Sequence, residues 1–151
     1  MSTLGDRKLK TVLYVEDHEV NILLMQALLR HRHGLHLVVA TTGAQACELT
    51  TGLEPAVLLL DIRLPDCTGT ELLRRLRQHA GCRNVPAVAV TAEHDFSLHG
   101  TGFVELWTKP LRFEQTLARL DALVDGHAAA PPTAQYARHQ EPAAVPRARW
   151  R

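Results

Sequence analysis

Short apolar segments alternate with amphipathic segments along most of the chain. Five of the apolar segments have the length of β-strands, and they cover residues 11–15, 35–40, 56–60, 87–90 and 103–107. The second, third and fourth are apolar almost throughout, which is typical of strands covered on both faces of a sheet. The pattern therefore predicts a sheet that is buried between two layers of other elements.

The segments between these strands carry apolar residues at helical spacing. They predict helices over 20–28, over 44–49 after Thr42 or Gly43, from Thr68 onward, and over 113–124. We expect Gly34 to cap the first of these helices at its C-terminus and Gly126 to stop the last. Thr68 and Glu71 have the spacing of a capping box, which marks the start of a helix.

The order of these elements is one of regular alternation between strand and helix. Such alternation predicts an α/β fold, in which a doubly wound, five-stranded parallel sheet has right-handed crossovers and helices on both faces. Ligands and chemistry in such sheets lie outside the carboxyl ends of the strands. Functional residues are therefore expected at that edge.

The length and the C-terminal composition predict one domain with short extensions. The 151 residues suit a single hydrophobic core. After Gly126 the chain contains four prolines, several alanines and little bulky apolar material. We therefore expect an N-terminal extension over 1–9, a folded domain over 10–125, and a disordered Pro/Ala/Arg tail over 126–151 with no effector domain, DNA-binding domains included.

Charge, cysteines and hydropathy exclude several other classes of protein. The net charge is only +1, and the excess of arginine lies in the tail, so we do not expect a basic face for nucleic acid. The three cysteines Cys47, Cys67 and Cys82 form no C-x-x-C pair, which favours a reducing compartment. No apolar run approaches the roughly 18–20 residues that cross a bilayer, and the N-terminus lacks a signal peptide. We therefore expect a cytoplasmic protein without a membrane partner.

Polar residues of complementary chemistry follow four of the predicted strands. Glu16 and Asp17 follow the first, Asp61 ends the third, Thr91 ends the fourth, and Lys109 follows the fifth. Three neighbouring carboxylates suit a hard divalent cation such as Mg²⁺, which prefers carboxylates together with phosphate oxygens. A lysine and a threonine can bind phosphoryl oxygens, so the set predicts a site for an aspartyl phosphate on Asp61.

Four sequence motifs, in order, resemble those of the receiver domain of bacterial two-component response regulators. They are VLYVED at 12–17, LLLDIRLPDCTG at 58–69, VAVTA at 88–92 and TKPL at 108–111. The resemblance covers about residues 10–125 and implies a flavodoxin-like fold that binds Mg²⁺ or Mn²⁺. It also implies a partner, a histidine kinase or a histidine phosphotransfer protein, which supplies the phosphoryl group.

The resemblance also implies a role for each residue that matches a motif. Asp61 would be the phosphoacceptor. The metal would be held by Asp17 directly, by Glu16 through Asp17 or through water, by Asp61 and by the backbone carbonyl of Arg63. The phosphoryl group would be bound by Thr91, the Ala92 backbone amide and Lys109, and the Lys109–Pro110 bond is expected to be cis. No enzymatic turnover is implied beyond self-catalysed phosphorylation and dephosphorylation.

The sequence departs from the receiver pattern between Thr91 and Lys109. This stretch is several positions shorter than in such domains and carries two glycines, so we predict that the fourth helix of the family is missing or reduced. Leu106, with Trp107 beside it, occupies the place of the usual aromatic switch residue. The conformational switch, which would otherwise couple Thr91 to that ring, is therefore expected to be altered. Dimerisation is not expected through the usual fourth-helix face.

Other interpretations of the chain remain open. The chain could be a phosphorylation-independent adaptor on the receiver fold, or a segment of a hybrid histidine kinase, and its downstream protein is unknown. A phosphatase with Asp61 as nucleophile is a weaker alternative, because Arg63 stands where such enzymes need a second aspartate. His18 is expected to be an exposed loop histidine, and Cys67 is expected to have no redox role.

Overall fold

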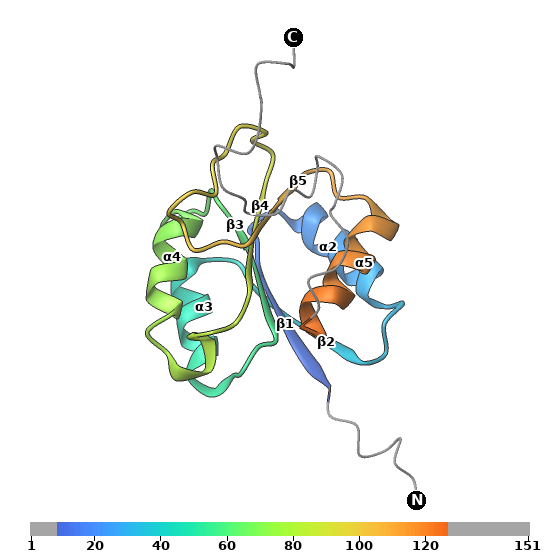
Figure 1. Cartoon of the computed structure of the whole chain (residues 1–151), viewed down its shortest axis with the longest axis horizontal. Helices are drawn as coiled ribbons and strands as arrows, with labels where there is room; N and C mark the ends of the chain where they lie inside the picture. The colour runs from blue at the N-terminus through green and yellow to red at the C-terminus, as the bar shows by residue number, and fades with distance from the viewer. Residues whose placement is uncertain (1–8, 127–151) are drawn as a thin grey trace, which may run out of the picture.

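The computed structural model describes residues 9–126, which form a parallel sheet with helices on both faces (Figure 1). The strands are β1 (Lys10–Val15), β2 (Leu35–Ala40), β3 (Val57–Asp61), β4 (Ala87–Thr91) and β5 (Glu105–Thr108). The helices are α2 (Glu19–Leu29), α3 (Gly43–Leu49), α4 (Gly69–Leu76) and α5 (Phe113–Val124), with short 3₁₀ turns at Thr50–Gly52 and Ala80–Cys82. The predicted doubly wound, flavodoxin-like architecture is confirmed.

The strand order β2-β1-β3-β4-β5 places β1 in the interior of the sheet. From β1 the chain moves to β2 on one side and then crosses to β3 on the other, and all four strand pairs are parallel. Ligands bind in such sheets where the strand order reverses, outside the carboxyl ends of the two strands concerned. In this chain that point lies between the ends of β1 and β3.

Alternate residues of the strands supply two separate hydrophobic cores. Leu58 and Leu60 of β3 pack on the side of α3 and α4, whereas Val57 and Leu59 pack on the side of α2 and α5. Figure 1 shows the two helix pairs on opposite sides of the sheet. Because both faces of β3 and β4 are covered, their residues are buried along the whole strand, as the continuous apolar runs predict.

Three of the four predicted helix termini are confirmed and one is wrong. Thr42 caps α3, and Thr68 with Glu71 forms the predicted capping box of α4. Gly126, which follows Asp125 at the C-terminus of α5, has a φ of 79°, a backbone conformation that glycine adopts without a steric penalty. Gly34 does not cap the first helix, because α2 already ends at Leu29 and its last turn is closed by Arg30 in a right-handed conformation.

The segment between β4 and β5 contains no helix, since residues 92–104 form only turns and bends. The family's fourth helix, which would lie here and is distinct from α4 of this chain, is therefore reduced as predicted. Phe96 and Phe103 make an edge-to-face contact with centroids 6.4 Å apart, and both pack into the core on the side of α3 and α4. β5 begins at Glu105, two residues later than predicted, because Phe103 belongs to this packed segment rather than to the strand.

Parts of the predicted domain organisation lie outside the described residues. These are residues 1–8 of the N-terminal extension and residues 127–151 of the tail. Among the residues that the structure describes, no helix has both the length and the apolar composition needed to cross a membrane.

Candidate functional site

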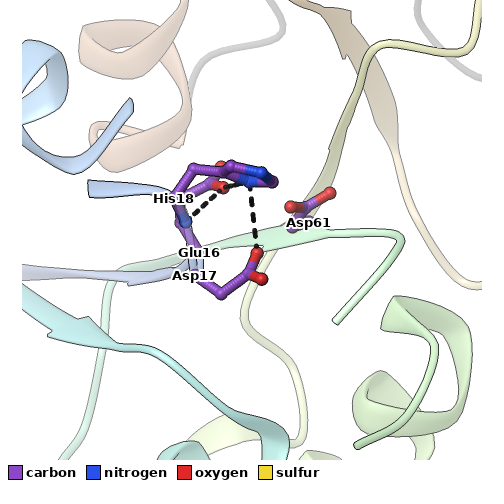
Figure 2. A group of neighbouring side chains, drawn as sticks. All are labelled: Glu16, Asp17, His18 and Asp61. Atoms are coloured by element: carbon purple, nitrogen blue, oxygen red, sulfur yellow. Dashed lines mark hydrogen bonds and ion pairs between the residues drawn. The ribbon is translucent and has the colours of Figure 1, made fainter. Parts of the chain in front are cut away.

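Carboxylates from the ends of β1 and β3 meet at the point where the strand order reverses. Glu16 and Asp17 directly follow β1, and Asp61 is the last residue of β3. Each of these residues, together with His18, offers a ligand atom, and the four atoms all lie within 4.8 Å of one another. Figure 2 shows that the four side chains come from two segments that are far apart in the sequence. The predicted acidic cluster therefore forms.

Glu16 is fully buried and has a hydrogen-bond donor at each oxygen. Its Oε1 accepts from Lys109 Nζ at 2.8 Å and from the Tyr14 hydroxyl at 3.0 Å, and its Oε2 accepts from the His18 backbone N–H at 3.1 Å. Burial acts to raise the pKa of Glu16, but Lys109 and these hydrogen bonds outweigh it, so the pKa lies below its ordinary value. Glu16 is therefore ionised at neutral pH.

Asp61 is nearly buried beside the same lysine. Its Oδ2 lies 3.3 Å from Lys109 Nζ, and its Oδ1 accepts from the Arg63 backbone N–H at 3.3 Å. Burial raises the pKa of Asp61 to about 6; the Lys109 charge opposes this rise, and the Glu16 charge adds to it. At neutral pH most of Asp61 is an ionised carboxylate whose negative charge is poorly compensated.

Thr91 and Lys109 are joined at the carboxyl ends of β4 and β5. Thr91 is buried, its backbone carbonyl accepts from the Lys109 N–H at 2.9 Å, and its Oγ1 accepts from the Glu93 N–H at 3.1 Å. Ala92 follows Thr91 directly at this edge. The Lys109–Pro110 bond is cis, as predicted. The backbone hydrogen bond between Lys109 and Thr91 holds the Lys109 backbone beside β4, and from there Lys109 Nζ reaches both Glu16 and Asp61.

The side chains of Arg63 and His18 lie at the rim of the acidic cluster. The Arg63 side chain, 80% exposed, forms an ion pair with Glu93, so the loops after β3 and β4 are joined. His18 is 72% exposed, and its Nδ1 lies 3.4 Å from Glu16 Oε2 and 3.4 Å from Asp17 Oδ1. His18 is the exposed loop histidine that was predicted, and it also belongs to the cluster of possible metal ligands.

Leu106 and Trp107 point to opposite faces of the sheet. Leu106 packs in the core beside α3 and α4, together with Phe103. Trp107 packs in the core beside α2 and α5, and its Nε1 donates to Glu105 Oε1 at 2.9 Å. Glu105 also pairs with Arg119 of α5 in a buried ion pair. An aliphatic side chain thus occupies the predicted switch position, and the ring beside it lies on the other face.

The donor set fits a hard divalent cation. Three carboxylate side chains converge, and one of them, Asp17, is exposed and so accessible from solvent. Oxygen ligands of this kind are the ones that Mg²⁺ prefers, with water completing its shell. Cysteine is absent from the cluster, which does not favour a soft metal.

Two polar residues at this edge of the sheet did not emerge from the sequence. One is Tyr14, whose hydroxyl reaches Glu16; the alternation of side chains along a strand could have suggested it, because residues two apart share a side. The other is Asp66, whose carboxylate accepts from the Gly43 N–H at 2.8 Å and from the Ala44 N–H at 2.9 Å. Asp66 thereby ties the loop after β3 to the start of α3.

The chain is similar in sequence to response regulator receiver domains. The family model described as the response regulator receiver domain matches residues 12–121. The polar-differentiation response regulator DivK of Brucella ovis is 34% identical over 83 residues, which are 55% of this chain and 67% of that protein.

Solved structures share the fold. The receiver domain of the sensor histidine kinase PA1611 of Pseudomonas aeruginosa, described with a magnesium ion coordinated in its active site cleft, is 27% identical with a TM-score of 0.68. That match covers 78% of this chain and 98% of that one. The chemotaxis response regulator CheY4 of Vibrio cholerae, 21% identical with a TM-score of 0.68 over 77% of this chain and 99% of that one, shares the fold alone.

Proposed function

The chain belongs to the family of response regulator receiver domains of two-component signalling, and from this membership we propose that Asp61 is its phosphoacceptor. The observation that carries the proposal is the position of the Asp61 carboxylate, which lies within 4.8 Å of the other acidic ligand atoms and 3.3 Å from Lys109 Nζ. The Asp61 carboxylate, the other carboxylates that would hold the metal, and the Lys109 ammonium are thus close enough together to act on one phosphoryl group.

The proposed reaction is the transfer of a phosphoryl group from a phosphohistidine of a partner to Asp61. A carboxylate oxygen of Asp61 forms a bond to phosphorus, and the bond between phosphorus and the donor imidazole nitrogen breaks, with the electron pair leaving on that nitrogen. Only the ionised carboxylate is a nucleophile. Because the pKa of Asp61 is about 6, this form predominates at neutral pH.

We propose that Glu16, Asp17, Asp61 and the backbone carbonyl of Arg63 hold Mg²⁺ or Mn²⁺. When bound, the cation would offset the repulsion between the Asp61 carboxylate and an incoming phosphoryl group and stabilise charge on its oxygens. The acidic cluster supports this assignment, and the magnesium ion named for the PA1611 receiver domain supports it by analogy.

Lys109, Thr91 and the Ala92 amide are proposed to bind the oxygens of the phosphoryl group. The Lys109 ammonium already lies between two carboxylates and has three N–H donors to share. The Thr91 hydroxyl accepts from Glu93 and has its own hydrogen free to donate. The phosphoryl group would therefore bind to Thr91 and Lys109, the same residues whose hydrogen bonds connect β4 to β5 and to the Glu93 loop.

We further propose that the partner is a histidine kinase or a histidine phosphotransfer protein, in the cytoplasm, and that the output is a contact with another protein. No catalytic turnover is proposed beyond the chain's own phosphorylation and dephosphorylation. Leu106 at the switch position and the helix-free segment 92–104 favour an output that differs from the usual switch. These two features also favour the second candidate, an adaptor that binds its partner regardless of phosphorylation.

The test is incubation of the full chain with acetyl phosphate and Mg²⁺, followed by measurement of the intact mass. We expect the mass of one phosphoryl group to be added to the wild type and to the matched control Asp66→Asn, and not to Asp61→Asn. Asp66 lies in the same loop, but its carboxylate faces Gly43 and Ala44. A wild type that stays unmodified, with acetyl phosphate and also with a phosphorylated histidine kinase, would rule out the proposal in favour of the adaptor.

A further inference from the structure

The hydroxyl of Tyr14 makes a buried contact with Glu16. Tyr14 lies in β1, is 1% exposed, and its ring packs in the core beside α2 and α5. Its hydroxyl donates to Glu16 Oε1 at 3.0 Å. A tyrosine hydroxyl carries its proton at neutral pH, so it remains a donor. The Tyr14 ring is thus fixed in the core, while its hydroxyl contacts the acidic cluster at Glu16.

The contact fixes how the Glu16 carboxylate is turned. Oε1 is occupied by Tyr14 on the core side and by Lys109 at 2.8 Å, and Oε2 faces the His18 N–H at 3.1 Å. Of these donors, Lys109 is the one that the proposed function assigns to the phosphoryl group as well. A lysine ammonium on a flexible stem can turn between partners, whereas the Tyr14 ring is held by packing.

We propose that Tyr14 is a positioning residue for the divalent cation, acting through the Glu16 carboxylate. This inference rests on the proposed function, in which Glu16 is a metal ligand. The neutral hydroxyl keeps Oε1 occupied and the carboxylate oriented while Lys109 turns toward Asp61. It does so without adding a positive charge that would repel the cation. Partners that hydrogen-bond metal ligands typically contribute a factor of about 10–100 to metal affinity or activity.

The experiment is a calorimetric titration of the full chain with Mg²⁺, comparing the wild type with Tyr14→Phe. Phenylalanine retains the ring, and Glu16 keeps the donors from Lys109 and His18, so the fold is expected to persist. We expect the dissociation constant for Mg²⁺ to rise about 10-fold. At saturating Mg²⁺, the rate of phosphorylation by acetyl phosphate should return to within about twofold of the wild type. The reason is that Tyr14→Phe disturbs only the orientation of the metal ligand Glu16 and leaves the reacting group, Asp61, in place.

Thr50→Val is the matched control, because it also removes one buried hydroxyl. Thr50 is 2% exposed, its Oγ1 donates to the Ala46 carbonyl at 3.0 Å, and it lies before β3, at the opposite end of the strand from Asp61. Its loss should lower the thermal midpoint and leave the Mg²⁺ dissociation constant unchanged. A purely structural role for Tyr14 would give the same pattern as this control.

Two results would overturn the inference and leave the proposed function intact. One is a Tyr14→Phe variant that binds Mg²⁺ within about twofold of the wild type, and the other is a Thr50→Val variant that loses as much affinity as Tyr14→Phe. A wild type that neither binds Mg²⁺ nor takes a phosphoryl group would instead contradict the proposed function, and the role of Tyr14 with it.

Discussion

Replacing Asp61 by asparagine should stabilise the metal-free protein. The Asp61 carboxylate is nearly buried and close to Glu16, and its pKa is raised from 3.8 to about 6 even with Lys109 beside it. A raised pKa means that the folded state disfavours the ionised form, so ionised Asp61 lowers the free energy of unfolding. Asparagine keeps the size and polarity of the side chain and removes the charge.

The size and sign of the effect follow from linkage between protonation and folding. One pKa unit corresponds to about 1.4 kcal/mol, so the rise at Asp61 corresponds to about 3 kcal/mol as an upper value. Above pH 6 the carboxyl is ionised in both the folded and the unfolded chain, and the full cost is present. Between pH 6 and about pH 4 the folded chain takes up a proton first and the cost shrinks; below that range both states are neutral and it vanishes. We expect Asp61→Asn to gain about 1–3 kcal/mol at pH 7.5 and nothing at pH 3.5.

The assay is urea denaturation of the wild type and Asp61→Asn in metal-free buffer across this pH range. Asp66→Asn is a control of opposite sign, because hydrogen bonds from Gly43 and then Ala44 lower the pKa of Asp66. Its carboxylate stabilises the fold above its unfolded pKa, and that contribution is lost as the pH falls through the folded pKa. Asp66→Asn should therefore be less stable than the wild type at pH 7.5. An Asp61→Asn variant that is equally or less stable than the wild type at pH 7.5 would refute the electrostatic reasoning.

Two further substitutions test buried contacts outside the acidic cluster. Phe103→Ala should lower the free energy of unfolding by about 3–5 kcal/mol, because the ring is buried against Phe96 in the segment that stands in for a helix; a loss below about 1 kcal/mol in urea denaturation would show that this segment adds little to the core. Arg119→Met should cost about 3–5 kcal/mol, because it leaves Glu105 buried without its ion-pair partner. Adding Glu105→Gln to Arg119→Met should recover part of that loss in the same assay, and a double variant no more stable than the single one would contradict the assignment.

The architecture and the outline of the site were predictable because both depend on local pattern. Apolar runs such as 57–60 can be buried on both faces only inside a covered sheet, and polar residues at the strand ends then must lie on one edge. Asp61, Thr91 and Lys109 follow directly from that rule. The reduced fourth helix was predictable for the same reason, because a short segment with two glycines does not sustain a helix.

The features that escaped prediction depend on contacts between distant segments. Asp66 lies in a loop, and only the fold places its carboxylate at the start of α3, more than 20 residues earlier in the chain. Phe103 is the first residue of the predicted strand 103–107, yet it packs against Phe96, and the strand begins at Glu105. Residue type alone suggests Gly34 as a C-cap. The helix α2 ends earlier, however, because Arg30 closes its last turn with backbone hydrogen bonds to Gln26 and Leu28.

The central claim, that Asp61 carries the phosphoryl group, is tested most directly by locating the modified residue. After incubation with acetyl phosphate and Mg²⁺, borohydride reduces an aspartyl phosphate and marks its position, which peptide mass spectrometry can then read. The account predicts that the mark lies on Asp61 and disappears when the cation is removed with a chelator. A mark on Asp17 or Asp66, or no mark on any aspartate, would contradict it.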